Sequence, residues 1–88
     1  MNNPIRRKQV AKAVLEALSM AGGYALEVSR LWNFVNDLVK PEVQFTERGV
    51  ILKMLLDGGF VRKTTDDLDP GMELLVITDL GRNYLASL

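Results

Sequence analysis

Apolar residues recur every three or four positions near the start of the chain. This spacing predicts an amphipathic helix from about residue 4 to residue 20. Asn3 is a suitable N-cap, and Pro4 is favoured at the first helical position. Gly22-Gly23 is typical of a helix stop. The apolar face predicted for this helix consists of Val10, Ala11, Val14, Leu15, Ala17 and Leu18.

A short strand and a second helix are predicted next. Residues 24–28 alternate in a way that favours a strand, because Leu26 and Val28 would then point to the same side. Ser29 is placed to cap a helix that runs to about Val39. Pro41 ends this helix, since the residue before a proline disfavours helical backbone.

A third helix is predicted after a connection of several residues. Thr46 fits its N-cap, and the helix runs to about Asp57. Phe45 just before the cap and Val50 inside the helix have the spacing of a hydrophobic staple. Gly58-Gly59 then ends the helix.

The last third of the chain predicts a β-hairpin followed by a short helix. Phe60-Val61 opens a strand, and 66–71 is a polar turn that contains Pro70-Gly71. Residues 74–77 are apolar and partly β-branched, as expected of the returning strand. Thr78-Asp79 then caps a final helix that runs to the end of the chain.

Two short stretches carry a resemblance to a known family. Gly59-Phe60-Val61-Arg62 resembles the "GLVxR" that follows the recognition helix of winged-helix domains. Ile77-Thr78-Asp79-Leu80-Gly81-Arg82 resembles the "LTxxGR" that follows their wing. The resemblance covers about Val10 to Leu85. It implies an α+β winged helix-turn-helix in one domain, residues 1–88, in the order helix, strand, helix, helix, strand, wing, strand, helix.

The resemblance also implies a class of function. Winged-helix domains are mostly DNA-binding regulators of transcription, and they are often dimeric. In size the chain is similar to the small ArsR-like winged-helix proteins of Mu-like prophages. Fold alone does not fix function, however. We therefore also consider a winged-helix module for protein interaction or assembly that binds no DNA.

The composition limits the kinds of functional site that this 88-residue chain can form. It has neither cysteine nor histidine, which excludes disulfides, zinc-thiolate sites and the usual general base. We therefore expect no enzyme activity, no metal and no cofactor. No run is long enough to span a membrane and no signal peptide is visible, so a cytoplasmic location is expected. Eleven basic residues balance eleven acidic ones, which argues against strong non-specific DNA binding.

The resemblance implies that the third helix is the recognition helix, which contacts bases in the major groove. Its predicted outward face offers few groups that read bases, since only Lys53 is a strong donor. Arg48 falls where the family usually has an apolar residue, so it either swings out towards phosphate or marks a shift of the helix. The alternative is a helix buried nearly all round. The predicted outward face consists of Thr46, Glu47, Gly49, Val50, Lys53 and Met54.

Two further groups of cations are candidates for phosphate contacts. Arg62 and Lys63 lie on the first wing strand, and Arg6, Arg7 and Lys8 lie in an acid-free N-terminal stretch. Each group has a plain alternative. The N-terminal cluster is then a solvated helix face, and the wing tip with its three aspartates is a solvated acidic turn that repels phosphates.

An apolar surplus predicts self-association. The chain is 48% apolar, more than one small core can bury. Trp32 and Phe34 lie about 160° apart on the second helix, so we expect one of them to point outward. The resemblance implies a dimer built by the first and last helices. The residues expected at this interface are Ile5, Leu15, Leu80, Tyr84 and Leu88.

Overall fold

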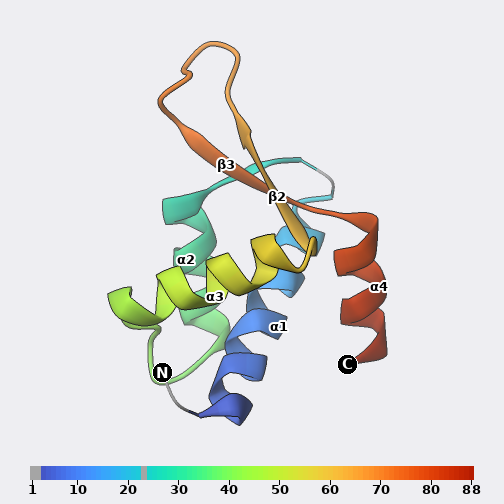
Figure 1. Ribbon diagram of the computed structural model, residues 1–88. Coiled ribbons are helices and arrows are strands. Elements are labelled where there is room, and N and C mark those ends of the chain that lie inside the picture. The colour runs from blue at the N-terminus through green and yellow to red at the C-terminus, as the bar shows by residue number, and fades with distance from the viewer. Residues whose placement is uncertain (1–2, 23) are drawn as a thin grey trace.

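The computed structural model describes residues 3–22 and 24–88. These residues form an α+β winged helix, as the sequence predicts, in which four helices pack with a small antiparallel sheet (Figure 1). The elements are α1 (Pro4–Met20), β1 (Leu26–Glu27), α2 (Val28–Leu38), α3 (Phe45–Asp57), β2 (Val61–Thr65), β3 (Glu73–Ile77) and α4 (Asp79–Ser87).

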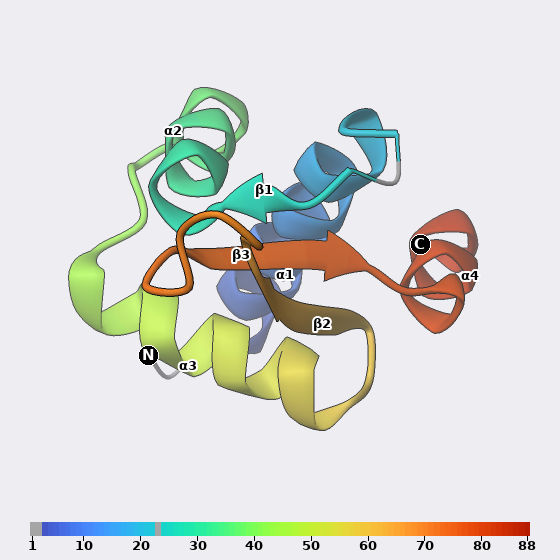
Figure 2. The same cartoon turned by 90° about the horizontal axis from the view of Figure 1, so that it is seen from above.

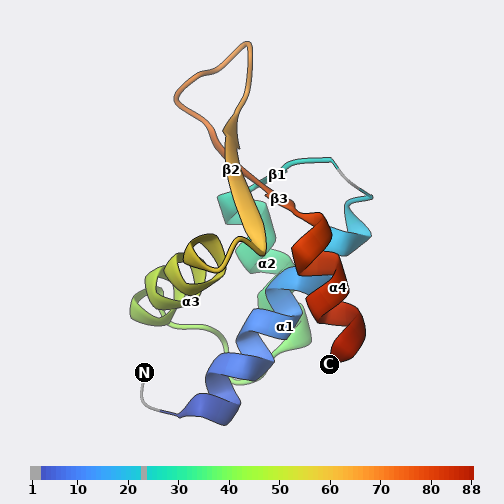
Figure 3. The same cartoon turned by 45° about the vertical axis from the view of Figure 1, so that its right-hand side comes forward.

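The first helix begins and ends near the predicted residues. The Asn3 Oδ1 accepts hydrogen bonds from the backbone amides of Ile5 and Arg6, at 3.0 and 3.3 Å. At the other end, Gly22 adopts a left-handed backbone with φ +66°. Gly23, the other glycine of the predicted stop, lies outside the described residues. Figure 3 shows α4 crossing α1, and the two helices are in contact.

The sheet has the strand order β1-β3-β2 (Figure 2). The wing hairpin pairs Val61 with Ile77 and Lys63 with Leu75. Its far end projects away from the helices (Figure 1). The first strand is shorter than the predicted span 24–28, since only its two residues 26–27 pair with β3.

The starts of α2 and α3 differ from the prediction. The Ser29 hydroxyl does not cap α2, because the helix has already begun at Val28 and the hydroxyl donates to Glu27 Oε1 at 2.6 Å. Thr46 does not cap α3 either. The Glu47 carboxylate accepts a hydrogen bond from the backbone amide of Gln44 at 2.9 Å, which makes Gln44 the N-cap, two residues earlier than predicted.

The predicted hydrophobic staple at α3 is also wrong. Phe45 is the first residue of α3, not the residue before its cap, and its side chain is 84% exposed. Val50 is 44% exposed as well, so neither side chain covers the other from solvent.

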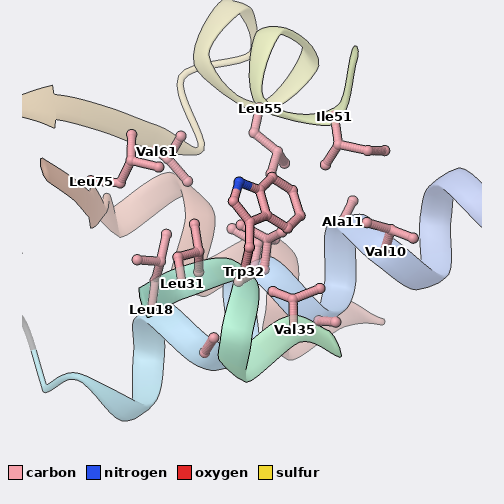
Figure 4. Packing of buried hydrophobic residues seen from close by; sticks show 14 of the residues in the cluster. Val10, Ala11, Leu18, Leu31, Trp32, Val35, Ile51, Leu55, Val61 and Leu75 are labelled. Carbon is pink, nitrogen blue, oxygen red and sulfur yellow. The ribbon is translucent and has the colours of Figure 1, made fainter. Parts of the chain in front are cut away.

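The core lies between α1, α2, α3 and the sheet. Trp32 points from α2 towards Leu55 of α3 and is buried (Figure 4). Phe34 is 48% exposed, so the expectation that one of these two aromatic residues points outward is confirmed. Leu15, by contrast, is completely buried in this core.

Candidate nucleic-acid interface

A groove of about 320 Å³ separates α3 from the wing. Its floor is apolar and comes from both helix and sheet, through Leu52, Leu56 and Leu75. Lys53 on α3 and Lys63 on β2 both line it. Two cations that are ten residues apart in the sequence therefore meet at one concave surface.

Each of these lysines is paired with a neighbouring carboxylate. Lys53 Nζ lies 2.7 Å from Asp57 Oδ2, and this hydrogen bond raises the pKa of the Lys53 ammonium group. Lys63 Nζ lies 3.8 Å from Glu73 Oε1. All four side chains are more than half exposed, so water screens both pairs. A phosphate can compete for such weakly held cations.

The two wing cations do not lie on the same side of the sheet. Successive side chains of a strand point to opposite faces, and Lys63 shares its face with Leu75. Arg62 is paired with Val76, so it lies on the opposite face and is exposed. The groove therefore receives Lys63 but not Arg62.

Arg6 is engaged within the fold. Its Nη2 donates to the carbonyl oxygen of Pro41 at 2.6 Å, and its Nε lies 3.4 Å from Glu47 Oε2. Only 15% of its side chain is exposed. Arg6 thus ties the start of α1 to the connection between α2 and α3.

The other two residues of the N-terminal cluster lie at a separate hollow. Arg7 and Lys8 line a volume of about 380 Å³ together with Met54 of α3 and Tyr84 of α4. Arg7 is half-buried, and its Nε has no hydrogen-bond partner. Lys8 is exposed.

Arg48 stacks on two aromatic rings. Its guanidinium carbon lies 4.8 Å from the ring centre of Phe45 and 5.5 Å from that of Trp32. Its Nε is buried without a hydrogen-bond partner. Arg48 therefore fastens α3 to α2 through cation–π contacts and does not swing out of the helix. Thr46, in the first turn of α3, is exposed.

The acidic wing tip is organised by its own side chains. The Asp66 carboxylate accepts the backbone amides of Leu68 and Asp69, at 2.8 and 3.2 Å. The Asp69 carboxylate accepts the amide of Gly71 at 3.2 Å. Two of the three aspartates thus shape the turn, which is the local role typical of aspartate in turns.

Sequence reasoning missed the carboxylates that pair with the groove lysines. The Lys53–Asp57 spacing of four residues on a helix was a visible signal. The Lys63–Glu73 pair depends on the register of the hairpin, which the sequence did not show.

The expected dimer residues separate into buried and exposed groups. Leu15 is wrong as an interface residue, because it lies wholly in the core. Tyr84 packs its ring on Phe60, with 4.7 Å between ring centres. Ile5 and Leu88 remain exposed and line one hollow between α1 and the end of α4. Leu80 is exposed at the start of α4.

Two further features bear on the class of function. Within residues 3–22 and 24–88, no group of three or more acidic, histidine or cysteine side chains is placed to hold a metal ion. In the same residues, no helix combines the length and apolar character needed to cross a membrane.

Comparison with known proteins identifies the fold. No family model matches the sequence, and no curated protein does. Solved structures do match. TA0346 of Thermoplasma acidophilum, assigned as a transcriptional regulator, gives a TM-score of 0.76 at 16% identity over 99% of this chain and 81% of its own.

Two other matches are larger proteins. The PcaV transcriptional regulator from Streptomyces coelicolor gives a TM-score of 0.70 at 22% identity over 89% of this chain. The transcriptional repressor CouR, solved on a 23-mer DNA duplex, gives 0.65 at 21% identity over 86% of this chain. The chain spans about half of each, 52% of PcaV and 48% of CouR.

Proposed function

We propose that this chain is a winged-helix DNA-binding protein that regulates transcription. In this proposal α3 enters the major groove and the wing lies along the phosphate backbone. The observation that carries it is the groove between α3 and the wing, where Lys53 and Lys63 come together on exposed, weakly paired side chains. The fold it shares with solved regulators, one of them bound to DNA, supports the same function.

The proposed contacts are fewer than the sequence predicts. Arg6 and Arg48 are held by Glu47 and by aromatic rings, so we assign them to the fold. Arg62 can contact phosphate from the outer face of the wing. The residues proposed to contact DNA are Arg7, Lys8, Thr46, Lys53, Arg62 and Lys63.

We also propose that the protein acts as a homodimer. Ile5 is 69% exposed and Leu88 38% exposed, and both line one hollow between α1 and α4. A second copy would cover this surface and would place two copies of α3 on one duplex. We further propose a cytoplasmic, non-enzymatic regulator. A phage origin is what the resemblance to the small ArsR-like proteins of Mu-like prophages implies.

Salt-dependent binding to duplex DNA tests the function. Fluorescence anisotropy of a labelled random-sequence duplex should show binding that weakens as salt rises, by a slope of about 0.9 for each phosphate contact. Replacing Lys53, Arg62 and Lys63 together by alanine should weaken binding at least about tenfold and flatten this slope. Lys40→Ala is the matched control, since this exposed lysine lines a different hollow, beside Gln9.

A protein-interaction module is the second candidate, and three exposed apolar side chains favour it. Phe34, Leu38 and Phe45 are all about half exposed or more. Together with a net charge of zero, they suit an apolar partner better than a polyanion. Absence of salt-dependent binding to any duplex, with an intact fold, would favour this candidate over the regulator.

A further inference from the structure

Gly49 is a glycine that the fold does not require. It lies within α3, is exposed, and has ordinary helical backbone with a negative φ. A Cβ built on it meets nothing within 4 Å. Glycine inside a helix destabilises it relative to alanine, because the unfolded chain has more freedom to lose.

At two other glycines, packing within the fold leaves no room for a Cβ atom. A Cβ on Gly81 would lie 2.8 Å from the Ile77 side chain and closer still to the Phe60 carbonyl oxygen. A Cβ on Gly58 would lie 2.8 Å from the Cδ2 of Phe60. The fold explains these two glycines by close packing. Packing does not explain Gly49, so we ask whether a binding partner requires a glycine at this position.

The helix face around Gly49 is shallow and weakly polar. At 100° per residue, Thr46, Gly49 and Val50 lie on the side opposite the buried Ile51 and Leu55. Val50 is 44% exposed. The one cation on this face, Lys53, is hydrogen-bonded to Asp57. The face thus presents bare backbone and methyl groups where a base reader usually has arginine, asparagine or glutamine.

We propose that α3 recognises its DNA site by close apolar approach and not by side-chain hydrogen bonds. Gly49 lets the helix backbone sit close to the floor of the major groove, and Val50 and the Thr46 methyl contact the C5-methyl groups of thymine. Thymine is the one base that carries a methyl group in this groove. This inference rests on the proposed DNA-binding function and names the class of site, thymine-containing duplex.

Removing single thymine methyls tests the contact. A duplex selected from a random library with the wild-type protein is resynthesised with deoxyuridine in place of each thymine in turn, which deletes the methyl group and keeps the hydrogen-bonding edge. At one or more positions we expect affinity to fall about three- to fivefold, the value of one buried methyl group. Val50→Ala or Thr46→Ser should abolish that difference at the position it contacts.

Gly49→Ala tests the close approach. The melting temperature should rise by about 4 °C, because alanine favours the helix. Affinity for the selected duplex should nevertheless fall at least about tenfold. Ser19→Ala, an exposed helix position on α1, is the control and should leave affinity unchanged.

The outcomes separate this inference from the function on which it rests. Two results overturn the inference and leave the function standing. The first is that the wild-type protein binds every thymine duplex and its deoxyuridine counterpart with equal affinity. The second is that the Gly49→Ala variant binds as well as wild type. Failure of the wild-type protein to bind any duplex overturns both, and the selection step reveals this first.

Discussion

The Arg6 guanidinium reaches the Glu47 carboxylate, with 3.4 Å between Nε and Oε2. This contact joins the first turn of α1 to the first turn of α3, which are 41 residues apart. The same carboxylate accepts the backbone amide of Gln44. One side chain therefore both starts α3 and fixes its position on α1.

Glu47→Ala should destabilise the protein by about 1–2 kcal/mol at pH 7, since it removes a helix cap and a charged hydrogen bond. Urea unfolding followed by circular dichroism measures this difference. Glu16→Ala is the control. It breaks only the exposed pair between Glu16 and Lys12, with 3.8 Å between the charged atoms. Its effect should stay below about 0.5 kcal/mol.

The contribution of Glu47 should also depend on pH. The Gln44 amide, followed by Arg6, holds the pKa of the Glu47 carboxyl below its ordinary value of 4.5, although burial acts in the opposite direction. A carboxyl whose pKa is lowered in the folded state stabilises the protein above the unfolded pKa and loses that effect as pH falls through the folded value. The difference between wild type and Glu47→Ala should therefore shrink below about pH 4.5. A constant difference down to about pH 2 would contradict this assignment.

Gly81→Ala should destabilise the protein by about 2–3 kcal/mol, because its methyl group would press on the Phe60 carbonyl and the Ile77 side chain. Thermal unfolding should show the loss. Gly49→Ala is a matched comparison with the same chemical change at an open position, and it should act in the opposite direction. Equal effects at the two sites would show that packing against Phe60 is unimportant.

Removing the carboxylates of the groove should strengthen DNA binding. The double variant Asp57→Asn, Glu73→Gln frees Lys53 and Lys63 from their partners, and we expect about fivefold higher affinity for a random duplex. Asp67→Asn at the wing tip changes charge without freeing a groove lysine, so its effect should be smaller. An unchanged affinity in the double variant would place the bound DNA elsewhere on the protein.

Ile5→Glu should convert the proposed dimer to a monomer. The Ile5 side chain is 69% exposed in one copy, so the fold should tolerate the charge. In the dimer the second copy would cover this side chain, and burying the unpaired charge there would prevent association. Sedimentation equilibrium at micromolar concentration measures the mass. Leu68→Glu, at a wing-tip position that is 96% exposed, should leave the mass unchanged. A wild-type protein that sediments as a monomer rules out the dimer.

Local signals predicted the elements well and their exact starts less well. Asn3 caps α1 and Thr78 caps α4, because the capping side chain and its amides lie within three residues of each other. At α3 the sequence predicted Thr46 as the N-cap, whereas in the structure Gln44 is the N-cap and its amide donates to Glu47. Thr46 looked suitable, but Glu47 also gains Arg6 as a partner, and that contact comes from a distant part of the chain.

The site could be predicted only in part, for the same reason. Lys53 and Lys63 were candidates from sequence, but their meeting at one groove depends on how the wing packs beside α3. Leu15 shows the converse limit. An apolar helix face reveals that a residue is covered, and tertiary packing decides whether its own domain or a second copy covers it.

In the wing tip, the carboxylates of Asp66 and Asp69 accept hydrogen bonds from backbone amides of the same turn. These hydrogen bonds fix the shape of the turn at the end of a two-stranded arm. Five residues of strand span about 16 Å, so a tilt of about 10° at the base would carry the tip about 3 Å. That distance is close to the rise of one base pair along the axis of a duplex, about 3.4 Å. In the proposed complex, a slight flexing at the foot of the hairpin would let the wing follow a displacement of the phosphate backbone of that size while α3 stays in place.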